Sequence, residues 1–270
     1  MVALVVLVVV RLTNGSSSAP SAATNRSGTT ALSTSAEEEV THVPASILAS
    51  VGTPSTIEPP QRTMERRSLL RAADGEPRIV YVGAEFCPFC AAERWPLVVA
   101  LSRFGTFTGL RATHSSAVDA YPNTPTLSFY GSTYVSRYVS FSSVETTTNQ
   151  VDGRSYKPLQ KPTAEESRLM QTYDVPPYTT TPGTIPFIDF ANRFLQEGAS
   201  YDPRLLAGQS QGDIANELSQ PSNAIAQSID GTANLLTATI CNLTGGQPSR
   251  VCSMNEVKAA TERFAASTSS

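Results

Sequence analysis

The sequence predicts an α/β fold, and three stretches of the chain indicate it. RIVYVG (78–83) is a short apolar run rich in β-branched residues that follows the turn signal DGEP, as is typical of a buried strand. The segment from Cys87 to Gly105 has the apolar spacing of a helix, and residues 184–199 indicate a strand with its hairpin partner. Everything after Pro203 is expected to be helical, so the α/β part carries a helical C-terminal elaboration.

Further elements are expected between these segments. Alternating residues in 126–144, around Gly131, predict strands or a hairpin. The stretch PTAEESRLMQTYD predicts a helix whose first turn is closed by a capping box between Thr163 and Glu166. Pro88 stands where the first turn of a helix tolerates proline, whereas Pro96 lies inside that helix and should kink it.

The two ends of the folded part are also expected to be helical. Apolar residues recur at helical spacing in 43–51, and a second short helix is expected over 61–72. The last helix is expected to begin at SMNE, where Ser253 and Glu256 have the spacing of a capping box. A single domain over 43–268 is therefore predicted, with the helical elaboration starting at about residue 203.

Length and charge limit the functional classes. The chain has 270 residues, a net charge of −3 and a pI near 5.5. It is long enough to bury a substantial core. No basic stripe is visible, so the electrostatic footprint of a nucleic-acid-binding protein is missing and no nucleic-acid partner is expected.

The N-terminal region predicts export or membrane attachment. Residues 1–11, MVALVVLVVVR, form an apolar run about half as long as the roughly 20 residues that span a bilayer. They indicate a partial signal or membrane anchor, and a stray β-branched run is the alternative. Residues 12–40 are rich in Ser, Thr, Ala and Gly, and we expect them to form a flexible tether. The predicted location is extracytoplasmic, either membrane-anchored or secreted.

The four cysteines fall into two pairs, Cys87 with Cys90 and Cys241 with Cys252. Cys87 and Cys90 stand at the start of a predicted helix, where unpaired backbone N–H groups and the helix dipole lower the pKa of a thiol. Cys87 is nearer the end, so we expect it to be the exposed nucleophile. Cys90, one turn further on, would resolve the mixed disulfide.

Three other interpretations of the first cysteine pair remain open. Two more thiolates, Cys241 and Cys252, could complete a zinc site, although these cysteines are eleven residues apart and no C-x-x-C or His pair joins them. Cys87 and Cys90 could instead form a purely structural disulfide, which would constrain very little chain. The domain could also have lost its redox activity, since a fold does not guarantee a function. No metal and no bound cofactor are expected, and Trp95 is expected to pack in the core.

The combination of a strand, a C-x-x-C pair at a helix start and a later strand that opens with Ile-Pro resembles the thioredoxin superfamily. The local matches are AEFCPFC and IPFIDF. A closer resemblance covers most of the chain from about Val43. The segments AEFCPFCAAERW, YPNTPTLSFYGSTY, IPFIDFANRF, ASYDP and ICNLTGGQPSRVC are similar to an uncharacterised prokaryotic thioredoxin-like family, known only as a domain of unknown function. The resemblance implies a thioredoxin-like fold.

The resemblance also implies roles for particular residues. Ile185 and Pro186 would be joined by a cis peptide bond facing Cys87, with the Ile185 backbone open to pair with an extended substrate. The second X-Pro strand start, at Pro125, is the rival for this role. Thioredoxins carry a buried acid six residues before the first cysteine, where this chain has Tyr81. Thioredoxin-like proton transfer would then need another group, for which Glu85 is the candidate.

The second cysteine pair is expected to form a structural disulfide. ICNLTGG ends a helix at Gly245 and Gly246, and RVC leads into the final helix. A bond between Cys241 and Cys252 would hold these two segments together, and an exported location would let it persist.

These observations predict an extracytoplasmic thiol–disulfide oxidoreductase that acts by dithiol/disulfide exchange through its CPFC pair. Its partners would be cell-envelope protein thiols or disulfides, or a redox partner protein. The alternative, from a different class, is a membrane-tethered thioredoxin-like binding domain without redox turnover. The dipeptide Pro88–Phe89 between the cysteines does not indicate the direction of electron flow.

Overall fold

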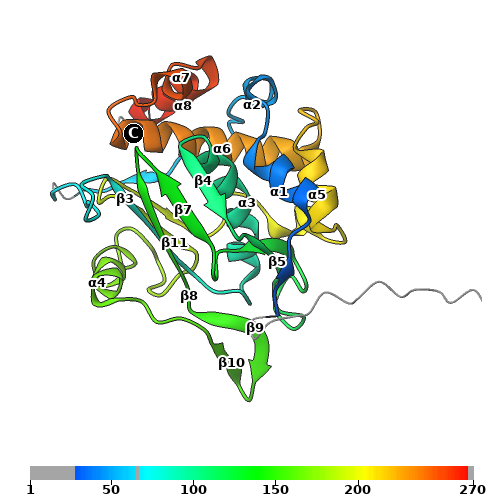
Figure 1. Cartoon of the computed structure of the whole chain (residues 1–270). Coiled ribbons are helices and arrows are strands. Elements are labelled where there is room, and N and C mark those ends of the chain that lie inside the picture. Colours follow the sequence, from blue (N-terminus) through cyan, green and yellow to red (C-terminus); the bar gives the residue numbers. More distant parts are fainter. Residues whose placement is uncertain (1–27, 65–66, 267–270) are drawn as a thin grey trace, which may run out of the picture.

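The computed structural model describes residues 28–64 and 67–266, and it has the mixed α/β architecture that the sequence predicts. Its centre is a five-stranded sheet in the order β2-β12-β11-β3-β8 (Figure 1). The strands are β2 (Gln61–Arg62), β3 (Arg78–Gly83), β8 (Ser140–Glu145), β11 (Phe187–Phe190) and β12 (Phe194–Glu197). β3 and β8 run parallel, whereas β11 is antiparallel to both β3 and β12.

The alternation of side chains along β3 divides the core into two layers. Ile79 and Tyr81 belong to the larger core, while Val80 and Val82 belong to a smaller core on the opposite face. Successive side chains of a strand point to opposite faces, so a strand that is apolar at every position must be covered on both sides. This explains why RIVYVG is a continuous apolar run.

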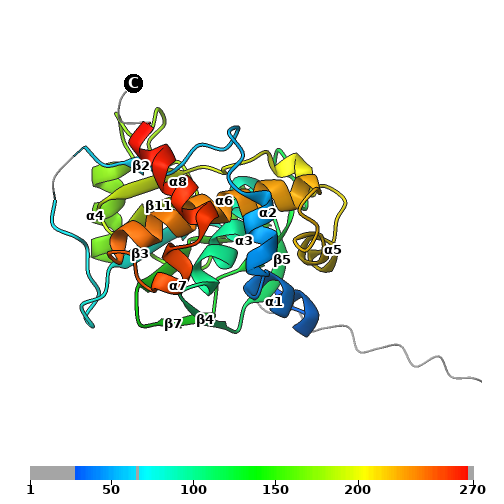
Figure 2. The same cartoon turned by 90° about the horizontal axis from the view of Figure 1, so that it is seen from above.

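Helices cover both faces of the sheet. α3 (Pro88–Ser102) and α6 (Ala224–Leu243) cover the larger core, together with α2 (Ala45–Val51) and α8 (Asn255–Ala266) (Figures 1 and 2). α4 (Ala164–Tyr173) lies on the opposite side, where Leu169 and Tyr173 complete the smaller core. The predicted capping box between Thr163 and Glu166 is present at the start of α4.

Three smaller sheets surround the central one. Their strands are β1 (Thr30–Ala31), β4 (Gly105–Thr108), β5 (Arg111–His114), β6 (Pro125–Ser128), β7 (Thr133–Ser136), β9 (Thr147–Asp152) and β10 (Ser155–Pro158). Residues 126–144 form strands as predicted, but no hairpin around Gly131, because β6 pairs with β5 and β7 pairs with β4. The β9–β10 hairpin projects from the sheet (Figure 1), and Tyr156 on β10 stacks its ring on Phe86 at 4.2 Å.

The prediction of a flexible tether over 12–40 is wrong for its described part. The structure forms β1 and then α1 (Thr34–Thr41), which is capped by Ser33. Ala36 and Val40 lie one turn apart and are buried in the larger core, and these two contacts order a segment whose composition is otherwise polar. The predicted anchor over 1–11 and the first part of the tether, up to residue 27, lie outside the described residues.

The prediction of a helix over 61–72 is also wrong. Gln61 and Arg62 pair with Leu195 and Phe194 as the short strand β2, and the Leu70 N–H donates to the Ala191 carbonyl. Several backbone groups of the described part of this segment therefore pair with the central sheet or with the turn after β11. Tertiary pairing overrides the local helical pattern here.

The C-terminal part is helical, as predicted. Besides α6 and α8 it contains η1 (Pro203–Leu206), α5 (Gln211–Glu217) and α7 (Ser249–Cys252). Ser253 ends α7 instead of capping α8, so the second predicted capping box is wrong, and the Glu256 carboxylate pairs with Arg103 at 3.2 Å. Across the residues that the structure describes, no helix has both the length and the apolarity needed to cross a membrane.

Candidate active site around Cys87 and Cys90

The cysteine pair lies at the junction between β3 and α3. Cys87 is the N-cap of α3, and its Sγ accepts a hydrogen bond from the Cys90 N–H at 3.3 Å. Pro88 occupies the first turn as predicted, where the missing N–H costs nothing. Both cysteines are free thiols in this structure.

The structure corrects the expected exposure of Cys87. Only 4% of Cys87 is exposed and Cys90 is fully buried, whereas Phe89 between them is 40% exposed. Cys87 is covered because the loop that ends at Pro186 lies against it. The Cys87 thiol donates to the carbonyl oxygen of Ile185, with 3.7 Å between Sγ and O.

The two thiols have opposite pKa shifts. The pKa of Cys87 is lowered, chiefly by its contact with the Cys90 thiol; burial opposes this, and the Cys90 N–H and the charge of Arg94 add to the lowering. Burial raises the pKa of Cys90 well above its ordinary value, and the neighbouring Cys87 raises it further. The pair titrates as a unit, in which Cys87 is the sulfur that ionises first.

Ile185 and Pro186 lie next to Cys87, whose sulfur contacts the Ile185 carbonyl oxygen. Their peptide bond is cis, as predicted, and Pro125, the rival candidate, is not among the prolines with a cis bond in the described part of the chain. The bonds before Pro177 and Pro248 are also cis. The geometry thus brings Ile185 together with Cys87, while its predicted role in substrate pairing remains a prediction.

A buried ion pair lies behind the cysteines, and the sequence analysis missed it. The Arg94 guanidinium donates through Nε to Glu145 Oε1 at 2.8 Å and through Nη2 to Glu145 Oε2 at 2.7 Å. Its Nη2 also donates to the Ala84 carbonyl at 2.8 Å. Arg94 follows Cys90 by four residues on α3, so both side chains lie on the same face of the helix. Its positive charge lowers the pKa of both thiols.

Tyr81 and Glu85 differ in how well they could move a proton. The Tyr81 hydroxyl is buried without a hydrogen-bond partner in the described part of the chain, and burial raises its pKa well above its ordinary value. Glu85 is buried too, and its Oε1 accepts from the Ser128 hydroxyl at 2.7 Å. Burial raises the pKa of Glu85 to about 7, and Ser128 opposes that shift. An acid that titrates near neutrality suits proton transfer better than a phenol.

The family comparison matches residues 67–242 to the domain of unknown function DUF929. The chain belongs to the DUF929 family. The match covers more than half of the chain and includes Cys87 and Cys90, the Ile185–Pro186 bond and the Arg94–Glu145 pair. No curated protein and no solved structure matches the chain significantly.

The second cysteine pair of this DUF929 protein is a disulfide, as predicted. Cys241 and Cys252 are bonded, with 5.6 Å between their Cα atoms, and they join the end of α6 to α7. α6 ends before Gly245 and Gly246, which both have positive φ, and the Gly246 N–H donates to the Cys241 carbonyl. Because these two sulfurs bind each other, they are not available as ligands for a zinc ion at Cys87 and Cys90.

Two further features connect α3 with the rest of the DUF929 domain. Glu93 is buried and accepts from the Ser200 N–H at 2.8 Å and from its hydroxyl at 3.1 Å, and burial raises the pKa of Glu93 to about 8. Trp95 is fully buried and its Nε1 donates to the Pro125 carbonyl at 3.1 Å, so the predicted core role is confirmed. Both contacts hold the helix that carries the cysteines.

Proposed function

We propose that this DUF929 protein is a thioredoxin-like thiol–disulfide oxidoreductase that acts outside the cytoplasmic membrane. The observation that carries the proposal is the environment of the Cys87 sulfur. It caps α3, accepts the Cys90 N–H and lies 3.7 Å from the Ile185 carbonyl oxygen, beside a cis-proline. This is a lowered-pKa thiol with a second thiol within reach, as dithiol exchange requires.

The topology supports thioredoxin-likeness. The cysteine pair follows β3 directly, β8 runs parallel to β3, and the cis-proline precedes β11, which is antiparallel to β3. The sequence resemblance leads us to expect a strand, a C-x-x-C helix start and a later strand that opens at a cis-proline. All three meet at one end of the central sheet.

The first step of the proposed reaction forms a mixed disulfide. The Cys87 thiolate attacks one sulfur of a substrate disulfide, the substrate S–S bond breaks, and its other sulfur leaves as a thiolate that takes up a proton. The Cys90 N–H and Arg94 stabilise the Cys87 thiolate before the attack. The negative charge then moves from Cys87 to the departing sulfur.

The second step releases the substrate. Cys90 loses its proton and attacks the Cys87 sulfur, which forms the Cys87–Cys90 disulfide and frees the remaining substrate thiolate. Glu85 is our candidate acceptor for the Cys90 proton, because its pKa is raised to about 7. In total, one substrate disulfide is reduced to two thiols while the protein dithiol is oxidised. The reverse sequence oxidises a substrate dithiol.

The proposed compartment follows from disulfide chemistry. The Cys241–Cys252 bond supports an oxidising compartment, where such bonds persist. The apolar residues 1–11 would supply the export signal or anchor that the sequence analysis predicts. Partners would then be cell-envelope protein thiols or disulfides, or a protein that restores the redox state of the pair, and the exchange itself requires no bound cofactor.

One observation favours a second candidate, a binding domain that keeps this fold without turnover. Cys87 is 4% exposed, so a substrate disulfide reaches its sulfur only after the loop at Ile185 shifts. A domain that never exchanges disulfides could tolerate such a cover permanently.

Alkylation kinetics separate the two functions. Under the proposed activity, iodoacetamide reacts with Cys87 in the reduced protein at neutral pH, and the protein catalyses the reduction of a peptide disulfide by a dithiol. A Cys87 that stays unreactive until strongly alkaline pH, together with no catalysis, would favour the binding domain. A reduction potential measured on the active protein gives the direction of electron flow.

A further inference from the structure

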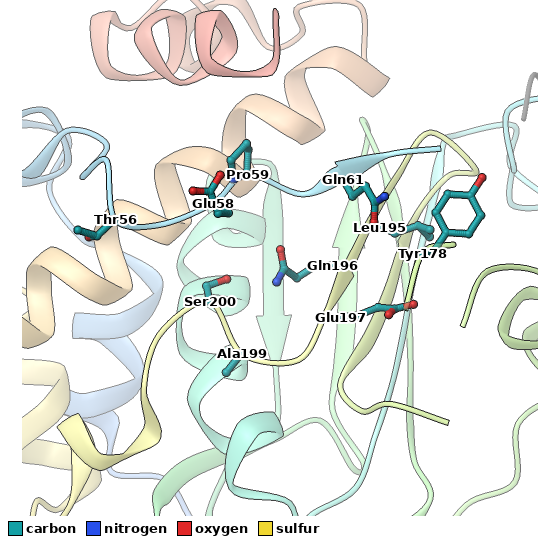
Figure 3. Close-up of a pocket in the computed structure, with 10 residues that line it drawn as sticks. All are labelled: Thr56, Glu58, Pro59, Gln61, Tyr178, Leu195, Gln196, Glu197, Ala199 and Ser200. Atoms are coloured by element: carbon teal, nitrogen blue, oxygen red, sulfur yellow. The ribbon is translucent and has the colours of Figure 1, made fainter. Parts of the chain in front are cut away.

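A polar pocket lies against the outer side of β12, close to the end of the sheet that carries the cysteines. It has a volume of about 360 Å³. Among its lining residues are Glu58 and Gln61 from the chain up to β2, Tyr178 from the loop before β11, and Gln196, Glu197 and Ser200 at the end of β12 and just after it (Figure 3). The proposed reaction uses none of these side chains.

The pocket borders an unpaired stretch of strand. β2 pairs only with Phe194 and Leu195 of β12, so in the described part of the chain Gln196 and Glu197 have a neighbouring strand on one side only, β11. In Figure 3, the Gln196 side chain extends into the space between this strand and the segment that carries Glu58. A free strand edge offers backbone donors and acceptors to an extended polypeptide.

Two contacts connect the pocket wall to the cysteine site. The Gly198 N–H donates to the Pro186 carbonyl at 2.9 Å, and Pro186 adjoins Ile185, whose carbonyl meets the Cys87 sulfur. Ser200 binds Glu93 of α3 through its N–H and its hydroxyl. A polypeptide held at Cys87 can therefore continue along the wall formed by residues 196–200.

Two acidic side chains and no basic one are among the residues that line the pocket. Glu58 and Glu197 contribute carboxylates, and no lysine, arginine or histidine is among the lining residues. Glu197 Oε1 is buried and has no hydrogen-bond partner within the described residues. The pKa of Glu197 is raised to about 7, chiefly by burial; the hydrogen bond with Thr179 opposes this shift and the nearby Asp174 contributes to it. An acid in this state gains from a cation that binds beside it.

We propose that this pocket receives a lysine or arginine side chain of the polypeptide whose cysteine exchanges with Cys87. The inference rests on the proposed oxidoreductase function and names its substrate class: extended segments with a basic residue near the reactive cysteine. The basic head group would donate to Glu197 and Glu58, while the polypeptide backbone follows the free edge of β12.

Matched peptide disulfides test the inference. Each peptide carries one cysteine, activated as an aromatic disulfide, and a single lysine, norleucine or glutamate placed two to five residues to either side of it. The second-order rate of Cys87 attack is measured at pH 8 and low salt. We expect lysine at the best position to exceed norleucine by about tenfold, as one charge-assisted hydrogen bond allows, and glutamate to be slowest.

Two variants and a matched control locate the effect. In Glu197→Gln and Glu58→Gln, the ratio of the lysine rate to the norleucine rate should fall towards one. Glu39→Gln removes an equal charge from the exposed face of α1 and should keep the ratio. The rate of Cys87 alkylation in each variant shows whether the thiol site is still folded.

The outcomes separate this inference from the proposed function. Exchange that proceeds equally with lysine and norleucine peptides overturns the pocket assignment and leaves the oxidoreductase standing. If the protein exchanges with no peptide at all, the proposed oxidoreductase function is overturned, and the pocket assignment that rests on it falls as well. If Glu39→Gln lowers the lysine preference as much as Glu197→Gln does, the preference comes from general attraction to the acidic protein. This result also overturns the pocket assignment. Competition by free butylamine without any lysine preference would identify a small-amine site instead and overturn the polypeptide assignment.

Discussion

Arg94 and Glu145 hold each other through two parallel hydrogen bonds of 2.8 and 2.7 Å in a place that solvent does not reach. Arg94 comes from the helix that carries the cysteines and Glu145 from the end of the parallel strand β8. A bidentate pair of this kind fixes the two elements in one relative position. Its positive member also lowers the pKa of Cys87, so one contact serves both the fold and the thiol.

Removing one member of this pair should destabilise the protein strongly. Arg94→Met leaves the Glu145 carboxylate buried without its partner, which costs about 3–5 kcal/mol. Urea unfolding of the variant and the native protein measures the loss. Arg204→Met is the matched control, because its ion pair with Asp202 is exposed to solvent and should contribute little to stability. If Arg94→Met lost no more free energy of unfolding than Arg204→Met, the conclusion that the Glu145 carboxylate depends on a buried partner would be wrong.

The double variant Arg94→Met/Glu145→Leu separates stability from chemistry. With both charges gone, no charge is left buried, so the free energy of unfolding should recover most of the loss. The pKa of Cys87 should still rise, because the Arg94 charge that lowers it is absent. The pH dependence of iodoacetamide alkylation measures this. An unchanged pKa would mean that Arg94 has no influence on the thiol.

The two cysteines should behave differently when one is replaced. Cys90→Ser should accumulate mixed disulfides with substrates, because attack by Cys87 proceeds and resolution does not. Cys87→Ser should capture almost nothing, since burial raises the pKa of Cys90 well above its ordinary value. Non-reducing gels of both variants, expressed in an exporting host, make the comparison. Equal capture by both variants would disprove the assignment of roles.

The Cys241–Cys252 disulfide should contribute measurably to stability. It closes a loop with a sequence separation of 11 residues, for which chain entropy predicts about 3 kcal/mol. Cys241→Ala/Cys252→Ala should lose that amount in urea unfolding. The measurement uses a Cys87→Ser/Cys90→Ser background, so that reducing agent acts on one pair only. Equal stability with and without reductant in the background protein would show that the bond contributes nothing.

A buried acid on α6 should make stability fall as the pH rises. Both carboxylate oxygens of Asp230 lack a hydrogen-bond partner within the described residues, and burial raises its pKa to about 8. In the unfolded chain Asp230 loses its proton near pH 4, so between pH 4 and pH 8 the folded state holds more protons than the unfolded one. The stability contributed by the neutral acid is complete below that window and is lost as the pH rises through it.

Asp230→Asn should therefore be more stable than the native protein at pH 8, by on the order of 5 kcal/mol, and nearly equal to it at pH 4. Urea midpoints across this range provide the test. Asp152 is exposed, so Asp152→Asn is the control and should leave the stability unchanged at both pH 4 and pH 8. The stability of the variant should depend less on pH than that of the native protein. Some pH dependence should remain, because burial also raises the pKa values of Glu85, Glu93 and Asp189. A variant whose stability falls as steeply as that of the native protein would exclude Asp230 as a cause.

Local patterns predicted β3, the start of α3 and the start of α4. The apolar run of β3, the proline in the first turn of α3 and the capping box of α4 each involve residues within one turn or one strand of each other. These patterns depend only on residues that are close together in the sequence, so they can be identified without knowing the rest of the fold. The position of Cys87 at a helix N-terminus followed directly from them.

Contacts between distant segments were not predictable in this way. β7 alternates as a strand should, but its partner β4 lies 25 to 31 residues earlier in the chain, from Thr108↔Thr133 to Gly105↔Ser136. Alternation gives the face of a strand and not its neighbour. Arg94 and Glu145 are likewise separated by 51 residues. The sequence shows a charge inside an apolar helix, which is the signal for a buried partner, but does not show which acid that partner is.

The packing of Trp95 gives the chain a built-in fluorescent probe on the helix that begins at Cys87. It is the single tryptophan in the sequence, it is fully buried, and it lies on α3 five residues after Cys90. Indole fluorescence from the unlabelled protein therefore originates at one point, in the helix that begins at the Cys87–Cys90 pair, with its N–H directed at the Pro125 carbonyl. Any shift of that helix between the dithiol and disulfide states changes the surroundings of this one emitter, and a stopped-flow fluorimeter can follow the change without an attached dye.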